Sequence, residues 1–202
     1  MLAIVPGSYT WCMSKGRLEA FSDGVIAILI TIMVLELKIP EGSDLHALRP
    51  MVPVFLAYVL SFVIIGIYWN NHHHMFQATD RINGKVLWAN LHLLFWLSLI
   101  PATTAWIGET SSAPVPTAVY GGVLLMAGLA YFILTRIILE CVGPQSRLAA
   151  AVGKDVKGKV SVVVYAAAIP LAFVNRWIAD ALYVVVVLMW LIPDPRIESK
   201  LS

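Results

Sequence analysis

Six apolar segments, four of them long enough to cross a lipid bilayer, occupy most of this chain. A helix that spans the hydrocarbon core needs about 20 predominantly apolar residues. Of the 202 residues, 59% are hydrophobic and only 13% are charged, whereas soluble domains carry roughly 25% charged residues. The sequence therefore predicts an all-α membrane protein and excludes a large soluble domain. The predicted spans are about Glu19–Ile39, Pro50–Phe76, Val86–Ile107, Val115–Leu139, Val160–Val174 and Trp177–Ile192.

The basic residues are divided unequally between the two sides of this six-span arrangement. With six spans, both termini share a side with the connections between spans 2 and 3 and between spans 4 and 5. That side collects eleven of the fourteen Lys and Arg residues, and the other keeps only Lys38, Arg49 and Arg176. The positive-inside rule then predicts a multi-pass protein of the cell membrane with both termini in the cytoplasm.

The predicted organisation is an N-terminal tail at 1–16, a six-helix transmembrane domain at 17–193 and a cytoplasmic C-terminal tail at 194–202. The first sixteen residues lack a basic segment followed by an apolar stretch, so we expect no cleaved signal peptide. Met1 and Met13 both remain open as the start of translation.

An ionisable residue, Asp23, lies about one turn inside the first predicted span, directly after Ser22. A charged side chain in hydrocarbon costs a few kcal/mol unless it is paired. Other polar or indole side chains lie near the cytoplasmic ends of the second and third spans. They are Trp69, Asn70, Asn71, His72, His73, His74, Trp88, Asn90 and His92. Because buried polar groups need partners in lipid, we predict one network joining Asp23 and Ser22 to a histidine, the Asn90 amide and a Trp indole.

The three consecutive histidines do not predict a metal site. Consecutive side chains diverge by about 100° around a helix, whereas zinc needs ligands that converge on one point. Cys12 and Cys141 match no disulfide or metal spacing. We therefore expect neither a bound metal nor a cofactor.

One stripe of the first span contains Ile28, Thr31 and Leu35, which follow the spacing i, i+3 and i+7 of a helix face. The stripe is compatible with ordinary helix packing, with Thr31 bonding back to the carbonyl of Ala27. It is also compatible with a pore formed by several copies of this helix, because rings of aliphatic side chains gate conduction by excluding water. Glu36 would then concentrate cations at the far mouth. The chain contains no TVGYG filter motif.

The motif Arg17-x-x-x-Phe21-Ser22-Asp23-Gly24 resembles the first helix of the prokaryotic transmembrane protein 175 family, whose animal relatives are endolysosomal potassium channels. The similarity continues through the stripe and into the second and third spans. The matching positions there are Ala27, Ile28, Thr31, Val34, Leu35, Glu36, Tyr68, Trp69, Asn71, His72, His73, Leu87, Trp88, Asn90, Leu91 and Pro101.

This resemblance implies a homotetramer in which the first helix of each six-helix subunit lines a central pore. Ile28 would form the narrowest ring, with Thr31 next and Leu35 nearest the outside. The resemblance also implies that one set of side chains holds the helix bundle together. That set is Arg17, Phe21, Ser22, Asp23, Trp69, His72, Trp88 and Asn90. His72 is favoured by its spacing to Trp69, and His73 is the alternative.

The resulting functional prediction is a leak-like, potassium-permeable cation channel rather than an enzyme. Its partners would be further copies of itself, the lipid bilayer, K+ and other monovalent cations. A proton-coupled transporter using Asp23 and His72 as a relay is the main alternative, although no inverted repeat is visible between 19–107 and 115–192. A membrane-embedded enzyme or haem protein using the histidines is a third possibility.

Overall fold

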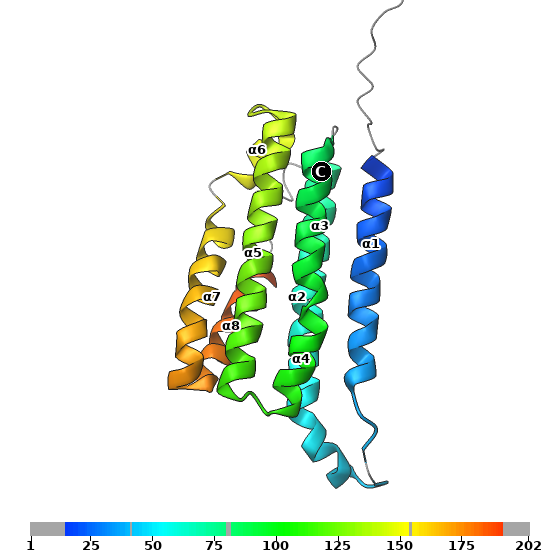
Figure 1. The fold of residues 1–202 in the computed structure, drawn as a ribbon, viewed down its shortest axis with the longest axis vertical. Helices are drawn as coiled ribbons and strands as arrows, with labels where there is room; N and C mark the ends of the chain where they lie inside the picture. Colours follow the sequence, from blue (N-terminus) through cyan, green and yellow to red (C-terminus); the bar gives the residue numbers. More distant parts are fainter. Residues whose placement is uncertain (1–14, 41, 80–81, 154, 192–202) are drawn as a thin grey trace, which may run out of the picture.

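The structure, a computed structural model, describes residues 15–40, 42–79, 82–153 and 155–191 (Figure 1). These residues form helices and connections without a β-strand among them, so the prediction of an all-α protein is confirmed. The elements are α1 (Lys15–Ile32), η1 (Met33–Glu36), η2 (Leu45–Met51), α2 (Val52–Gln77), α3 (Gly84–Ser98), α4 (Ile100–Glu109), α5 (Pro114–Val142), α6 (Arg147–Val152), α7 (Val156–Val174) and α8 (Arg176–Leu191).

Within the described residues, five helical segments are long and apolar enough to cross a membrane, which makes the chain a multi-pass membrane protein. They are Lys15–Glu36, Leu45–Gln77, Gly84–Glu109, Pro114–Val142 and Val156–Val174. The expected sixth span corresponds to α8, whose 16 residues extend only about 24 Å at 1.5 Å per residue. Its predicted end at Ile192 lies outside the described residues, as do most of the predicted N-terminal tail and all of the C-terminal tail.

Two predicted spans differ from regular single helices. The third span consists of α3 and α4, which meet at Leu99 immediately before Ile100-Pro101. Proline has no N–H for the helical ladder, and its ring disfavours a helical conformation in the preceding residue. The first span ends its α-helical part at Ile32 and continues as the 3-10 turn η1, so the helix predicted as far as Ile39 is shorter than expected.

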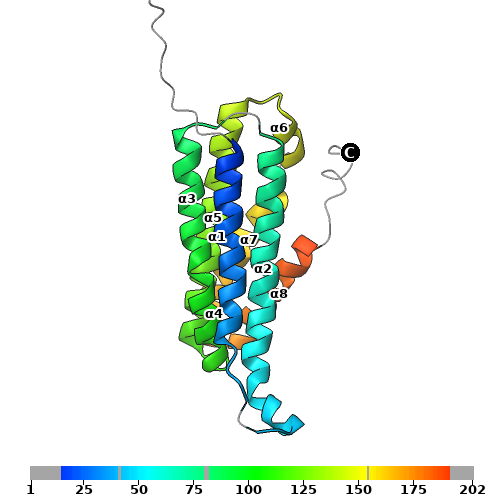
Figure 2. The ribbon, with the colours of Figure 1, turned by 90° about the vertical axis from the view of Figure 1, so that its right-hand side faces the viewer.

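The α1 helix lies at one edge of the bundle, where it packs against α2 and α3 (Figures 1 and 2). Behind them, α5 packs against α3 and α7, and α7 packs against α8. Seen from the α1 side in Figure 2, α1 stands in front, between α3 and α2. One face of α1 is therefore covered by the rest of the chain, and the opposite face is uncovered.

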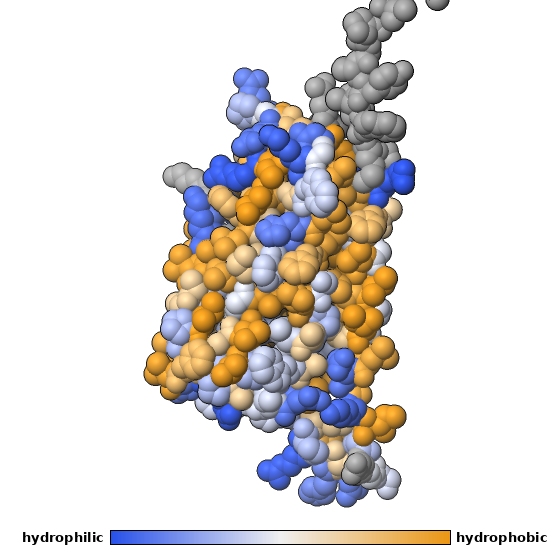
Figure 3. All heavy atoms as spheres, viewed as in Figure 1, coloured by the Kyte–Doolittle hydropathy of each residue, from blue (hydrophilic) through white to orange (hydrophobic). Residues whose placement is uncertain are grey.

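The two ends of the bundle differ in charge. The start of α1 with Lys15 and Arg17, the α2–α3 connection followed by Lys85, and α6 share one end, which we call the basic end. The η2 turn and the α4–α5 turn share the other end (Figure 1). Hydrophilic side chains gather at both ends of the bundle, and apolar side chains predominate between them (Figure 3). At the η2 end, Lys38 Nζ pairs with Glu109 Oε1 at 2.6 Å, and this bond raises the pKa of the exposed Lys38.

Three buried hydroxyl groups inside the bundle are paired with one another. Thr104 Oγ1 donates to Ser61 Oγ at 2.6 Å, and Ser61 Oγ lies 2.8 Å from Tyr120 Oη. This trio connects α4, α2 and α5 at buried positions. Nearby, Tyr183 Oη donates to the carbonyl of Thr117 at 2.9 Å and thereby joins α8 to α5. In hydrocarbon such pairing is required, because no water is available to satisfy these groups.

The contact between α5 and α8 depends on the absence of a side chain at Gly121. A Cβ atom there would collide with the Tyr183 hydroxyl. We expect Gly121→Ala to displace Tyr183 and to lower stability by about 1–3 kcal/mol, as overpacking does, measured by thermal unfolding in detergent. Gly122→Ala is the matched control, because nothing lies within 4 Å of its Cβ position. Equal melting temperatures for the two variants would contradict this packing.

Candidate functional site

A directional chain of hydrogen bonds joins the first three long helices near the basic end of the bundle. His72 Nε2 on α2 lies 2.8 Å from Asn90 Oδ1 on α3, and Asn90 Nδ2 donates to Ser22 Oγ on α1 at 2.9 Å. Ser22 Oγ in turn donates to the carbonyl of Leu18 at 2.9 Å. Because the Asn90 oxygen only accepts, His72 Nε2 is the donor in this arrangement. We call Ser22, His72 and Asn90 the polar clamp.

All three side chains of the polar clamp are buried, because helical periodicity places each on the apolar face of its helix. Ser22 follows Leu18 by four residues and precedes Ile26 by four, on the face of α1 that meets α2 and α3. The His72 ring packs 4.6 Å from the ring of Phe76. The clamp is therefore part of the helix interface, with its polar groups satisfied by one another.

A second connection between α1 and α2 lies beside the clamp and uses Asp23. Trp69 Nε1 donates to Asp23 Oδ1 at 3.0 Å. The other side of the indole stacks on His73, with ring centroids 5.9 Å apart and planes at 19°. The indole that pairs with Asp23 is thus that of Trp69. The single network predicted from the sequence is two separate sets of hydrogen bonds among the described residues.

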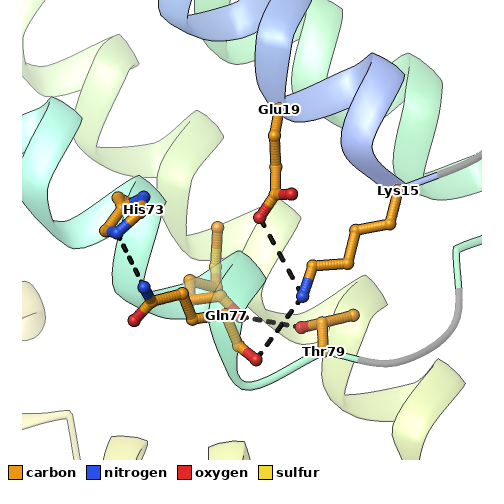
Figure 4. Close-up of polar contacts among 6 residues, drawn as sticks. Lys15, Glu19, His73, Gln77 and Thr79 are labelled. Carbon is orange, nitrogen blue, oxygen red and sulfur yellow. Dashed lines mark hydrogen bonds and ion pairs between the residues drawn. The ribbon is translucent and has the colours of Figure 1, made fainter.

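Contacts closer to the end of α2 extend this connection (Figure 4). The Gln77 amide nitrogen lies 2.8 Å from His73 Nε2. Lys15 reaches from α1 to the Gln77 carbonyl at 3.5 Å and to Glu19 at 4.0 Å. His72 and His73 therefore have different partners: His72 bonds Asn90, whereas His73 contacts Trp69 and Gln77. In the part of the chain that the structure describes, no three His, Cys, Asp or Glu side chains converge as a metal site.

Three residues of the expected motif lie away from these contacts. Trp88 is 76% exposed, and Arg17 and Phe21 also lie on the surface of the single chain. In the described part of the chain, no hydrogen bond joins the Trp88 indole to Asp23, which is bonded by Trp69 instead. Trp88 precedes Asn90 by two residues, about 200° around a helix, so both cannot face α1. Among the described residues, Trp88 and Phe21 are instead uncovered surface.

The stripe predicted to line a pore is also uncovered. Ile28 is 59% exposed and Leu35 is 78% exposed, and Thr31 lies between them on the free side of α1. Thr31 Oγ1 lies 3.0 Å from the carbonyls of both Ala27 and Ile28, the bond back to the helix that the sequence suggested. This face stands opposite the clamp, so the contacts that hold α1 in the bundle also determine which residues stay outside it.

The fold and these contacts define a multi-pass helical membrane protein whose first helix is fastened to the second and third by buried polar side chains. A family model described as "Endosomal/lysosomal potassium channel TMEM175" matches residues 17–101, which include both connections. The chain is also 54% identical over 190 residues to "Potassium channel HX13_20290" of Chryseobacterium sp. (strain P1-3), covering 94% of this chain and 99% of that protein. The chain belongs to the TMEM175 family.

More distant relatives and solved structures agree with this assignment. The chicken "Endosomal/lysosomal proton channel TMEM175" is 43% identical over 101 residues, which cover 44% of this chain and 20% of that one. The crystal structure of a lysosomal potassium-selective channel TMEM175 homolog from Chamaesiphon minutus superposes with a TM-score of 0.76 at 28% identity, covering 87% of this chain and 95% of that one. A variant of the potassium channel MtTMEM175 matches at 15% identity with a TM-score of 0.59, covering 95% and 97%, which shows the fold alone.

Asn90 bridges two other side chains, so its loss should be costly. Asn90→Ala leaves the buried His72 Nε2 without its acceptor and removes the donor to Ser22 Oγ, which keeps only its bond to the Leu18 carbonyl. An unsatisfied buried polar group costs about 1–3 kcal/mol. We expect a clear fall in melting temperature in detergent. The control is Asn70→Ala, which removes the same side chain from an exposed position on α2. If Asn90→Ala melts together with this control, the clamp does not stabilise the bundle.

Proposed function

We propose that this chain forms a potassium-permeable channel whose pore is lined by α1 from several copies. The observation that carries the proposal is the uncovered stripe of Ile28, Thr31 and Leu35 on a helix that is fastened from behind by the polar clamp. Rings of branched aliphatic side chains exclude water and thereby control conduction. The names of the bacterial relatives as potassium channels add support.

The assembly we propose is a homotetramer with α1 at its centre. Because α1 lies at an edge of the subunit, copies can bring their uncovered stripes together around one axis (Figure 2). The helices beside it, α2 and α3, would then face the neighbouring subunits. Such contacts would cover Arg17, Phe21 and Trp88. This would explain why these three residues lie on the surface of the single chain although the family resemblance assigns them to the stability of the bundle.

We place the basic end of the bundle in the cytoplasm of the cell. Lys15, Arg17, Lys85, Arg136 and Lys159 lie on elements or ends that gather there, and basic residues are retained on the cytoplasmic side. Ile28 would then lie deeper in the membrane and Leu35 nearer the outside. Glu36 is exposed beyond it and would supply negative charge at that mouth. In this role the protein is a passive conductor that needs no cofactor and performs no catalysis.

The arrangement of the polar groups favours a channel over a proton relay. Asp23 bonds Trp69, whereas His72 bonds the Asn90 amide, so the two proposed relay residues belong to separate chains of hydrogen bonds. We expect Asp23→Asn to retain a carbonyl acceptor for the Trp69 indole and to leave K+ flux per folded channel nearly unchanged. Proton-coupled transport predicts loss of flux in this variant and dependence of wild-type flux on a proton gradient.

The primary test is ion efflux from liposomes that contain only this protein. We expect efflux when they are loaded with K+, without any proton gradient or added energy source. A parallel set loaded with Na+ measures the preference between the ions. If neither ion leaves faster than from protein-free liposomes, the chain is not a channel.

The constriction can be tested by making it polar. Ile28→Asn should wet the ring, raise Na+ leak severalfold and reduce the preference for K+, because an amide hydrates where a branched alkyl group excludes water. Val163→Asn is the control, since Val163 is 67% exposed on α7, away from α1. Unchanged conduction and selectivity in Ile28→Asn would place the pore elsewhere.

A further inference from the structure

A groove of about 600 Å³ runs between α2 and α8, away from the polar clamp. Its walls are apolar and include Val52, Leu56 and Val59 on α2 and Val184 and Leu191 on α8. Each of these five side chains is exposed on the subunit surface. Both helices belong to the bundle that crosses the membrane, so the groove faces hydrocarbon or a neighbouring subunit. The exposed apolar walls offer no hydrogen-bond partners, so water is a poor occupant of this part of the groove.

The end of the groove near the α4–α5 turn is polar. Asp180 lies there with Ser111 and Ser112. Among the described residues, Asp180 has no cationic side chain within 4.0 Å. Arg176, one turn earlier on α8, has its guanidinium 4.8 Å from the Trp177 ring centroid and still contributes positive potential at Asp180. A half-buried carboxylate without an ion-pair partner at the edge of the membrane is a binding feature for a cation.

We infer that this groove binds one phospholipid with a primary ammonium headgroup, of the phosphatidylethanolamine type. An acyl chain would lie between α2 and α8, the ammonium would donate to Asp180, and the phosphate would face Arg176. A primary ammonium brings three N–H donors, and the carboxylate and serine oxygens can accept them. A choline headgroup has the charge without N–H donors, and a glycerol headgroup has no cation. This site is separate from the pore and depends only on membrane insertion.

The test uses the full chain reconstituted in nanodiscs containing equal amounts of ethanolamine, choline and glycerol phospholipids. After transfer to detergent, native mass spectrometry identifies the lipids that remain bound. We expect selective retention of the ethanolamine lipid. Asp180→Asn should lower its preference over the choline lipid about tenfold, as loss of a charge-assisted hydrogen bond predicts. Equal retention of the three lipids by the wild type, or an unchanged preference in Asp180→Asn, would overturn the inference.

The acyl-chain part of the site is tested by filling the groove. Val184→Trp should abolish lipid retention, whereas Val185→Trp should not, because Val185 is also exposed on α8 but does not line the groove. Thermal unfolding verifies that both variants are folded. A second copy of the chain is the alternative occupant of the groove. In that case, disulfide crosslinking of cysteines placed in the groove would yield only subunit dimers, and lipid retention would be the same in both Trp variants. This result would show that the inference is wrong. Ion flux measured on the same samples reports on the channel independently.

Discussion

Hydrocarbon provides no hydrogen-bond partners, so polar groups in the membrane must bond one another. Here a series of hydrogen bonds runs from His72 through Asn90 and Ser22 to the Leu18 carbonyl, and the rest of the site depends on it. Three long helices contribute to this chain, and each group can keep its bond only if the helices hold their rotation and depth. Exchange with water, which makes such bonds weak in soluble proteins, is unavailable here. A few side chains can therefore determine how α1 is oriented.

This orientation separates two faces of α1 that differ in role. The inner face carries Leu18, Ser22 and Ile26 into the bundle, and the outer face leaves Ile28 and Thr31 uncovered. In the proposed channel, polar residues position the helix and apolar residues control conduction. The acidic side chain that stands out in the sequence, Asp23, belongs to the positioning contacts because its carboxylate is bonded to Trp69. The groove between α2 and α8 adds a lipid-facing surface on another side of the same subunit.

Hydropathy and the need for polar partners predicted much of this arrangement. Apolar lengths predicted the membrane helices, and the shared depth of Ser22 and Asn90 predicted that they would meet. The sequence did not predict which indole, Trp69 or Trp88, bonds Asp23. That depends on the rotation of the helices, since Trp88 and Asn90 face opposite ways on α3. The Ser61, Thr104 and Tyr120 trio was missed because hydroxyls spread through apolar spans have no distinctive spacing. Pro101 indicates the break between α3 and α4, which the apolar length of the third span does not.

The most direct test of the account is thiol accessibility along α1 during K+ efflux, in a background with Cys12 and Cys141 replaced by serine. Single cysteines at Ile28, Thr31 and Leu35 report on the outer face, and Leu29→Cys reports on the buried face. A water-soluble methanethiosulfonate reagent should block efflux through the first three variants and leave Leu29→Cys unaffected. Block at Leu29→Cys with no effect at the other positions would show that the uncovered stripe does not line the pore.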